Sequence, residues 1–351
     1  MAKEKIIMDV DTGSDDAIAL VMAMLDPEFE LLGICSVNGN IEVKLTTDNS
    51  LRVVECCDKQ GEVKVYKGCD LPMVATLTPW TSQSTGIRTP KIRNMPNPRR
   101  EGTRAGATEI HPEHLPLPDP IIKEEPISAV EFYLQTLRAA EDHSITLIPV
   151  GPLSNLAIAF RADPSVVRKV KKIVIMGGGH LVHNLSPAAE FNIWVDPEAG
   201  EVVQQAAWEN DVPVVWVSLD ATHEAYITVE QSKKIRDLGT KPAVLVADLI
   251  AQRTVGYSKD DADMKEKGGA PIHDALAVCA VLHPEVLKNV LHTNVHVDTG
   301  KSWGYGQTIV ERRIRVIEED KNAYFALGAD REMFYNWMYD VLANDKKERG
   351  I

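Results

Sequence analysis

The chain has 351 residues, of which 44% are hydrophobic and 25% are charged, and these are ordinary values for a globular protein with a sizeable core. Its 38 Lys and Arg residues against 51 Asp and Glu residues give a formal net charge of −13, which disfavours binding to nucleic-acid phosphates or to an anionic membrane surface. The longest apolar run, residues 17–25, is far shorter than the roughly 20 residues that span a bilayer. We therefore expect a small-molecule partner, with neither nucleic acid nor membrane.

The five cysteines form an odd-numbered set without a Cys-x-x-Cys pair, which disfavours a disulfide framework and a zinc ribbon. Residues 1–11 contain only a short apolar stretch, less than the core of a secretory signal requires. Both features predict reduced cysteines and a cytoplasmic protein.

Short apolar runs alternate with helical periods along the chain. Residues 5–10 predict a strand, and Ile18, Val21, Met22 and Leu25 follow it at the i, i+3, i+4, i+7 spacing of a helix. The later predicted elements are, in chain order, strand 31–37, helix 43–57, strand 63–66, helix 128–141, strands 145–150, 173–176 and 214–218, a strand region from 288 and a helix at about 330–345. This alternation predicts an α/β fold, an open, mostly parallel sheet with helices on both faces, whose ligand lies beyond the carboxyl ends of the strands.

A proline-rich stretch, residues 76–126, interrupts the alternation. It carries a basic cluster and no convincing period, so we interpret it with equal weight as a functional lid or as a disordered loop. His111 and His114 lie in this stretch, and we expect them to be solvated. The whole chain, 1–351, is expected to form a single domain with this insertion.

The segment IIMDVDTGSDDA, residues 6–17, is the most informative one. Asp9 and Asp11 share a face at the end of a buried strand, and Asp15 and Asp16 open the next helix, so four carboxylates are expected to converge. One alternative is a helix cap formed by the Thr or the Ser of this segment. Capping explains one or two of the residues, but four uncompensated carboxylates favour a cation. An oxygen-only ligand set suits Ca²⁺ or Mg²⁺ better than zinc.

A second candidate locus is the segment GGAPIHDALAVCAVL, residues 268–282. Pro271 suits the first turn of a helix, and the residues after Asp274 are almost wholly apolar, which predicts a deeply buried helix. His273 and Asp274 stand alone at its head. They are either capping residues or, because a buried carboxylate requires a partner, part of the proposed cation site.

A third locus is residues 184–196. In an extended conformation, Glu190 and Asn192 would point to one face and Phe191 and Ile193 to the other. These polar groups form either a satisfied core network or a hydrogen-bonding wall for a hydroxylated ligand. Binding of a nucleotide phosphate is disfavoured, because the chain has neither a G-x-G-x-x-G motif nor a P-loop.

Several motifs occur together in one order: DVDTGSDDA at 9–17, VNGN at 37–40, GPLSN at 151–155, MGGG at 176–179, NLSPAAEFN at 184–192 and HDALAV at 273–278. With these motifs the sequence resembles the inosine-uridine-preferring nucleoside hydrolases, which are calcium-dependent enzymes that cleave the N-glycosidic bond of ribonucleosides. The resemblance covers most of the chain. It implies release of ribose and free base by a calcium-bound water that an Asp activates.

Matched by motif, the resemblance implies that Asp11, Asp16, Asp274 and the carbonyl of Val150 bind Ca²⁺. Asp15 would be the general base. The resemblance also implies a homodimer or homotetramer. It leaves the preferred base open, because the family usually has a shorter loop in place of residues 76–126.

The resemblance further implies that Asn40, Asn184, Glu190 and Asn192 hold the ribose hydroxyls and that His273 faces the leaving base. The alternative is a non-catalytic ribose- or nucleoside-binding protein on the same fold. Because binding alone requires neither a base nor an acid, the presence of both Asp and His at these motif positions favours the enzyme.

Overall fold

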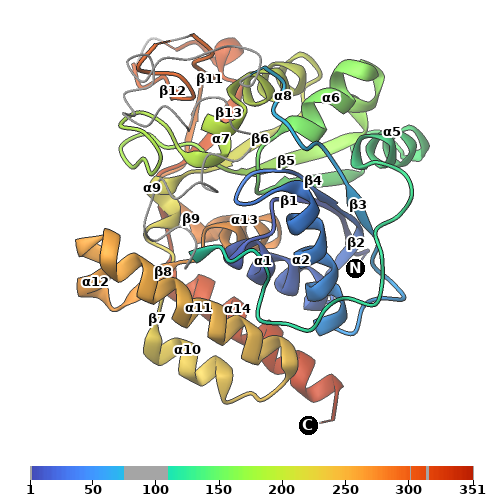
Figure 1. Ribbon diagram of the computed structural model, residues 1–351. Helices are drawn as coiled ribbons and strands as arrows, with labels where there is room; N and C mark the ends of the chain where they lie inside the picture. The colour runs from blue at the N-terminus through green and yellow to red at the C-terminus, as the bar shows by residue number, and fades with distance from the viewer. Residues whose placement is uncertain (1, 75–109, 301, 314–315, 351) are drawn as a thin grey trace.

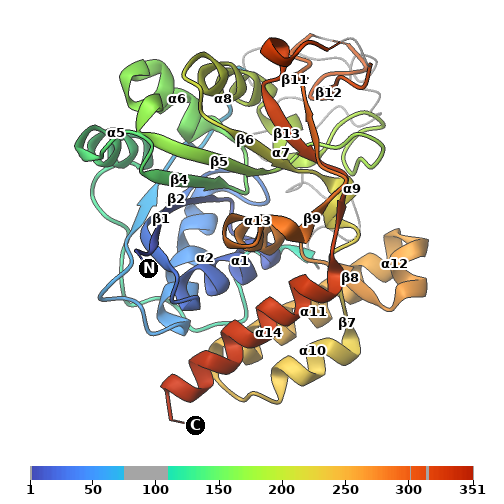
Figure 2. The ribbon, with the colours of Figure 1, turned by 180° about the vertical axis from the view of Figure 1, so that it is seen from behind.

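The computed structural model describes residues 2–74, 110–300, 302–313 and 316–350. Its centre is an eight-stranded sheet in the order β10-β13-β6-β5-β4-β1-β2-β3. All neighbouring strands run parallel except β10 and β13. Helices cover both faces of this sheet (Figure 1), as the view from behind also shows (Figure 2). The predicted α/β fold with a mostly parallel sheet is confirmed.

The strands of the large sheet are β1 (Glu4–Val10), β2 (Phe29–Ser36), β3 (Val65–Lys67), β4 (Ile145–Pro149), β5 (Val170–Met176), β6 (Val214–Val217), β10 (Leu291–Thr293) and β13 (Ala323–Ala326). Three two-stranded sheets are formed by β7 (Tyr226–Thr228) with β8 (Gly269–Pro271), β9 (Leu287–Lys288) with β14 (Gly328–Ala329), and β11 (Val295–Val297) with β12 (Thr308–Val310). Every strand predicted before residue 288 is present, with ends shifted by a few residues.

The helices that cover the sheet are α1 (Ser14–Leu25), α2 (Val43–Cys56), α5 (Ala129–Ala139), α6 (Ser154–Ala162), α8 (Pro197–Glu209), α11 (Lys241–Asp260), α13 (His273–Leu282) and α14 (Arg331–Glu348). Shorter helices are α7 (Phe191–Val195), α9 (Leu219–Thr222), α10 (Val229–Arg236) and α12 (Ala262–Lys267). Short 3-10 helices are formed by Pro164–Lys169, Pro284–Val286 and Glu318–Asp320.

The alternation of β1 divides the core into two layers. Ile6, Met8 and Val10 pack with α1, α13, α11 and α14, whereas Ile7 packs with α5, α6 and α8 on the other face. Helices α1 and α13 are buried almost on all sides. Their N-termini therefore lie inside the protein, where the polar residues that open them require buried partners.

Pro271 does not lie in the first turn of α13, contrary to expectation. It ends strand β8, and α13 begins two residues later at His273.

The five cysteines are all free thiols, as predicted. None of the helices in the described part of the chain is long and apolar enough to cross a bilayer.

Residues 76–109 of the insertion, on which most of the lid or loop interpretation rests, lie outside the described residues. The remaining part is anchored to α2. The Arg52 guanidinium donates hydrogen bonds to the carbonyl of Leu117 at 2.6 Å and to the carboxylate of Asp119 at 2.6 Å. The assignment of residues 1–351 to one domain stays a prediction.

The buried carboxylate of Asp196, which caps α8, gives the fold a pH dependence. Burial raises the pKa of Asp196 to about 6, although Ser154, Met73 and Ala199 donate hydrogen bonds to it. The folded protein then holds a proton at pH values where the unfolded chain has lost it. The free energy of unfolding should therefore fall, by up to about 3 kcal/mol, as the pH rises from about 4 to about 6.

Asp196→Asn should lack this part of the pH dependence, because an amide does not titrate. The measurement is urea unfolding at a series of pH values between 4 and 7. Asp163→Asn is the control: hydrogen bonds from Ser165 and Arg138 lower the pKa of Asp163, so this group is ionised in both states above about pH 5. Equal slopes for Asp196→Asn and the parent protein would contradict the prediction.

Candidate active site

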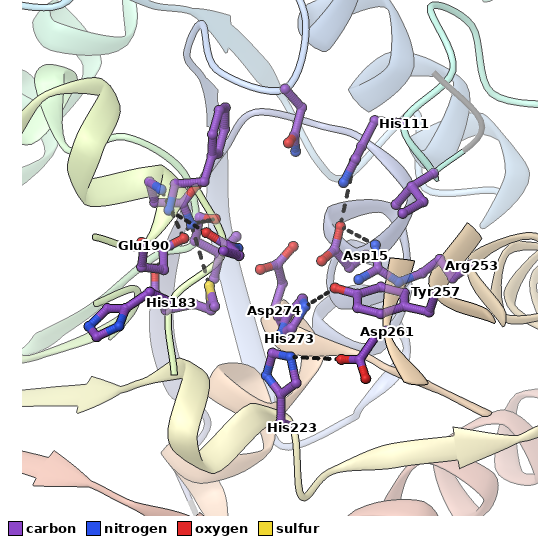
Figure 3. Close-up of a pocket in the computed structure, with 17 residues that line it drawn as sticks. Asp15, His111, His183, Glu190, His223, Arg253, Tyr257, Asp261, His273 and Asp274 are labelled. Atoms are coloured by element: carbon purple, nitrogen blue, oxygen red, sulfur yellow. Dashed lines mark hydrogen bonds and ion pairs between the residues drawn. The ribbon is translucent and has the colours of Figure 1, made fainter. Parts of the chain in front are cut away.

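A cavity of about 500 Å³ opens at the carboxyl ends of β1, β4 and β5 (Figure 3). Eight of the ten predicted site residues line it: Asp15, Asn40, Val150, Asn184, Glu190, Asn192, His273 and Asp274. The other two, Asp11 and Asp16, accept hydrogen bonds from Asn40. The structure thus brings together residues from five separate parts of the sequence, as parallel strands and their helices allow.

The loop between β1 and α1 is organised by its own carboxylates. Asp16 accepts hydrogen bonds from the backbone N–H groups of Asp11 at 3.1 Å and Gly13 at 2.9 Å. The cap residue of α1 is Gly13, so neither Thr12 nor Ser14 has that role. A Cβ at Gly13 would lie 2.0 Å from the His111 ring, which explains why a glycine stands there.

Negative charge accumulates in this region without full compensation. Asp11, Asp15, Asp16 and Asp274 are at most 5% exposed. Burial raises the pKa of Asp274 well above its usual range, and repulsion by the other three carboxylates raises it further. Burial and the charge of Asp15 act on Asp16 in the same direction. Such a cluster could hold a metal ion, and one ligand atom each of Asp15, Asp16 and His111 lie within 4.8 Å of one another.

Asp9 does not join this cluster, contrary to the expectation that all four carboxylates of the first motif converge. Its side chain accepts hydrogen bonds from the Tyr133 hydroxyl at 3.0 Å and from the Asn155 amide at 3.2 Å. These donors come from α5 and α6, on the other face of the sheet from α1. The fourth carboxylate of the cluster is instead that of Asp274, the second residue of α13.

The cluster is also contacted by a buried arginine, Arg253, which the sequence analysis did not predict. Arg253 on α11 is 0% exposed, and its guanidinium lies 2.9 Å from the Asp15 carboxylate. Burial alone would lower the pKa of Arg253, but Asp15, Asp274 and Asp16 raise it, so it remains a cation. Among the described residues that line the cavity, no other is a Lys or Arg.

Helix α11 directs a row of side chains, spaced four residues apart, toward the cavity. Arg253 and Tyr257 lie on the helix and Asp261 follows its last residue. The Tyr257 hydroxyl lies 2.6 Å from Nε2 of His273, and the Asp261 carboxylate lies 3.9 Å from Nε2 of His223. Figure 3 shows Arg253, Tyr257 and Asp261 along one side of the cavity. The i, i+4 spacing is visible in the sequence, but nothing there indicates their partners.

His273 is held at both ring nitrogens. Nε2 pairs with the Tyr257 hydroxyl, and Nδ1 lies 2.6 Å from the Thr222 hydroxyl. The ring is 5% exposed and borders the cavity, as predicted. Its orientation is therefore fixed from α9 and α11 as well as by its own position at the first residue of α13.

His111 is buried at the cavity wall, and the expectation that it is solvated is wrong. It is 8% exposed, and its Nδ1 lies 3.8 Å from the Asp15 carboxylate. Asn49 of α2 explains this position, because it accepts a hydrogen bond from the backbone of Leu115 at 2.9 Å and donates one to the Thr12 carbonyl at 3.1 Å. His114, by contrast, has a 53% exposed side chain, in agreement with the expectation.

The third locus forms the opposite wall, but it is not extended. Residues Phe191–Val195 form α7, and Glu190 caps it by accepting hydrogen bonds from the N–H groups of Asn192 and Ile193. The Asn192 amide donates to the Val150 carbonyl at 2.9 Å. Glu190 and Asn192 both face the cavity because one precedes the helix and the other lies in its first turn.

The comparisons with known proteins show the family of the chain. The family model described as inosine-uridine preferring nucleoside hydrolase matches residues 6–336. The chain belongs to this family. It is 34% identical over 309 residues to an inosine-uridine preferring nucleoside hydrolase of Leishmania major, with 88% of each chain covered. It is 32% identical over 346 residues to the pyrimidine-specific ribonucleoside hydrolase RihA of Escherichia coli O1:K1, with 94% and 98% covered.

Solved structures of nucleoside hydrolases are similar as well. A purine-preferring ribonucleoside hydrolase from Gardnerella vaginalis matches with a TM-score of 0.81 and 28% identity, over 98% of this chain and 100% of that one. This nucleoside hydrolase therefore hydrolyses ribonucleosides to ribose and free base, and the alternative of a non-catalytic binding protein is set aside.

The repulsion within the carboxylate cluster makes a prediction about stability. Asp274→Asn keeps the shape of the side chain and removes one buried charge, so in the presence of a chelator at pH 8 the variant should be more stable than the parent protein, by about 1 kcal/mol or more. If the cluster holds a calcium ion, the variant should also lose most of the stabilisation that added calcium would give the parent. The measurement is thermal denaturation with chelator and with calcium.

Asp26→Asn serves as the matched control, because Asp26 is buried outside the cavity and accepts a hydrogen bond from the Trp337 indole at 2.9 Å. It should leave the calcium response intact. An Asp274→Asn variant that is destabilised in chelator and still responds fully to calcium would show that this carboxylate does not belong to a cation site.

Proposed function

We propose that this nucleoside hydrolase depends on Ca²⁺, with Asp15 as general base and His273 as general acid. The observation that carries the proposal is the convergence, in one cavity, of a buried carboxylate cluster, a hydrogen-bonding wall and a histidine held at both nitrogens. Each of these three parts supplies one requirement of N-glycosidic bond hydrolysis.

The metal would be held by Asp11, Asp16, Asp274 and the carbonyl of Val150. The donor chemistry fits: all are oxygens, three are buried carboxylates whose charges are only partly offset, and Ca²⁺ prefers such ligands. Bound there, the ion supplies activation of a water molecule and an anchor for two vicinal ribose hydroxyls. A preference for ribose over deoxyribose is consistent with that anchor.

The sugar would be held by Asn40, Asn184, Glu190 and Asn192, which line the cavity. The Glu190 carboxylate also accepts N–H groups of α7, so its orientation is set before a substrate arrives. Asp15, on the opposite side, would accept the proton of the attacking water. As the bond to the base breaks, the ribose develops oxocarbenium character, which the surrounding carboxylates favour electrostatically.

The leaving base requires a proton because a purine or pyrimidine anion leaves poorly. His273 suits this task because its unperturbed pKa is near neutrality, and because the Tyr257 and Thr222 hydroxyls fix the ring at the cavity wall. His111, beside Asp15 on the side of the cavity formed by the end of the insertion, would lie near the base. The relatives named above differ in base preference, so the base that this enzyme prefers is a question for assay.

We expect Asp15→Asn to lower the release of ribose from inosine, uridine, adenosine, guanosine and cytidine by about 10² to 10⁴-fold, because the amide cannot accept the proton of water. The measurement is a reducing-sugar assay on the same five nucleosides for the parent and the variant. Because Asp15 would act on the water that attacks the ribose, the same activity is lost for every base, and the ranking of bases should stay the same. An Asp15→Asn variant with parental rates would remove the general-base assignment.

His273→Ala should slow inosine hydrolysis by about 10² to 10⁴-fold and scarcely affect p-nitrophenyl riboside, whose phenolate leaves without a proton. The two rates are measured side by side on one preparation. If His273 only stabilises the head of α13, both substrates suffer alike or neither does. Equal losses on the two substrates would therefore refute the acid role.

The proposal includes two further expectations from the sequence. These are a cytoplasmic location and assembly into a homodimer or homotetramer. Free thiols in all five cysteines are consistent with a reducing compartment. Light scattering of the purified enzyme measures the assembly state directly, and a monomer at micromolar concentration would contradict that part.

A further inference from the structure

Two residues of the cavity wall that the proposed mechanism does not use, His223 and Asp261, face each other next to His273 (Figure 3). Nε2 of His223 lies 3.9 Å from Oδ2 of Asp261, which is too far for a direct hydrogen bond. The centroids of the His223 and His273 rings are 5.5 Å apart. The pair therefore borders the place where the proposed acid would meet the leaving base.

Both atoms that face each other across this gap are hydrogen-bond acceptors. Nδ1 of His223 lies 2.9 Å from the carbonyl of Leu219, and because a carbonyl only accepts, Nδ1 carries a proton. Burial lowers the pKa of His223, which favours the neutral ring, so Nε2 is then an acceptor. The Asp261 carboxylate offers acceptors only. Two neighbouring acceptors suit a ligand group that carries N–H donors.

The start of α12 holds the Asp261 carboxylate in this orientation. Oδ1 accepts hydrogen bonds from the backbone N–H groups of Asp263 at 2.9 Å and Met264 at 3.0 Å, so Asp261 is the cap residue of that helix. Oδ2 is the oxygen that faces His223. Because 29% of the Asp261 side chain is exposed, a ligand in the cavity can reach it.

Purine bases differ in the group that they would present to this pair. Next to N7, adenine carries the N6 amino donor, whereas guanine carries the O6 acceptor, and hypoxanthine has the same 6-oxo group as guanine. N7 lies in the same ring as N9, the atom from which ribose is cleaved, so a proton delivered to N7 stabilises the leaving base. The 6-substituent is the neighbour of the atom that receives the proton.

We propose that His223 and Asp261 recognise the 6-amino group of a purine, so that this nucleoside hydrolase prefers adenosine to inosine and guanosine. The inference rests on the proposed role of His273 as the acid that faces the base. With His273 toward N7, the 6-substituent lies toward the His223–Asp261 pair. An amino group donates to these acceptors, whereas an oxo group meets them without a hydrogen between.

The mismatch with an oxo group disfavours inosine because it leaves acceptors of the site unpaired and places a third acceptor beside them. Among the described residues of the cavity wall the only Lys or Arg is Arg253, and it is paired with Asp15. Because Asp261 is partly exposed, we expect discrimination of about 10- to 100-fold, less than a fully buried polar site gives.

Asp261→Asn is the decisive variant. Asn caps helices as well as Asp does, so α12 should keep its start, but the amide can turn a donor toward the cavity. We expect the parent to have a higher kcat/KM for adenosine than for inosine, and the ratio of these values to fall at least about tenfold in the variant. Because the ratio is compared between two enzymes, the intrinsic reactivities of the two nucleosides cancel.

Asp330→Asn is the matched control, because Asp330 also caps a helix, α14, by accepting from the N–H of Met333, but it does not line the cavity. It should leave the ratio unchanged. The control substrate is p-nitrophenyl riboside, whose leaving group has no 6-substituent, and Asp261→Asn should hydrolyse it at the parental rate. If Asp261→Asn folds poorly, Asp261→Ser keeps a capping residue without the carboxylate and should lower the ratio as well.

A parent that prefers inosine, or an adenosine-to-inosine ratio that Asp261→Asn leaves unchanged, would overturn the inference. Equal losses on adenosine, inosine and p-nitrophenyl riboside would overturn it too, because Asp261 would then have a structural role only.

The proposed function is tested separately by His273→Ala. If that variant spares p-nitrophenyl riboside and slows inosine hydrolysis while Asp261→Asn keeps the parental ratio, the acid assignment stands and the recognition of the amino group fails. If His273→Ala slows both substrates alike and Asp261→Asn still lowers the ratio, the acid assignment fails and the recognition of the amino group stands.

Discussion

The structure depends on one electrostatic constraint, the burial of four carboxylates close to one another at the end of β1. Asp11, Asp15, Asp16 and Asp274 are at most 5% exposed, and burial together with mutual repulsion raises the pKa of Asp16 and Asp274. The protein offsets this charge with backbone N–H groups, with the Asn40 amide and with a single buried guanidinium. We infer that a cation completes the balance and that the chemistry uses that cation.

The fold brings the four carboxylates together and also supplies the groups that offset their charge. Parallel strands place the loop after β1, the end of β4 and the end of β5 at the same edge of the sheet, and the buried N-termini of α1 and α13 converge there. Helix α11 lies across this edge and contacts both helix heads through Arg253 and Tyr257. The proposed base and the proposed acid thus receive their orientation from the same scaffold element.

Local motifs were sufficient to predict much of the fold and the site, because the carboxylates and the apolar periods that bury them lie next to one another in sequence. Partners that meet only in space were not predictable. Arg253 reaches Asp15 across more than two hundred residues, and nothing near it in sequence marks it. His111 lies in a proline-rich stretch whose sequence predicts a solvated loop, and contacts made in the folded protein, such as those of Asn49 with the neighbouring backbone, place it in the wall. Asp9 was assigned to the cluster by its spacing, but Tyr133 binds it instead.

Calcium titration of the chelator-treated enzyme, with ribose release recorded on the same samples, tests the central claim most directly. The account predicts that the chelator-treated protein stays folded and inactive and that activity returns in proportion to calcium bound, up to one ion per chain. Full activity in chelator with no bound metal would contradict it, because the buried carboxylates would then have to perform the reaction without the cation that their charge requires.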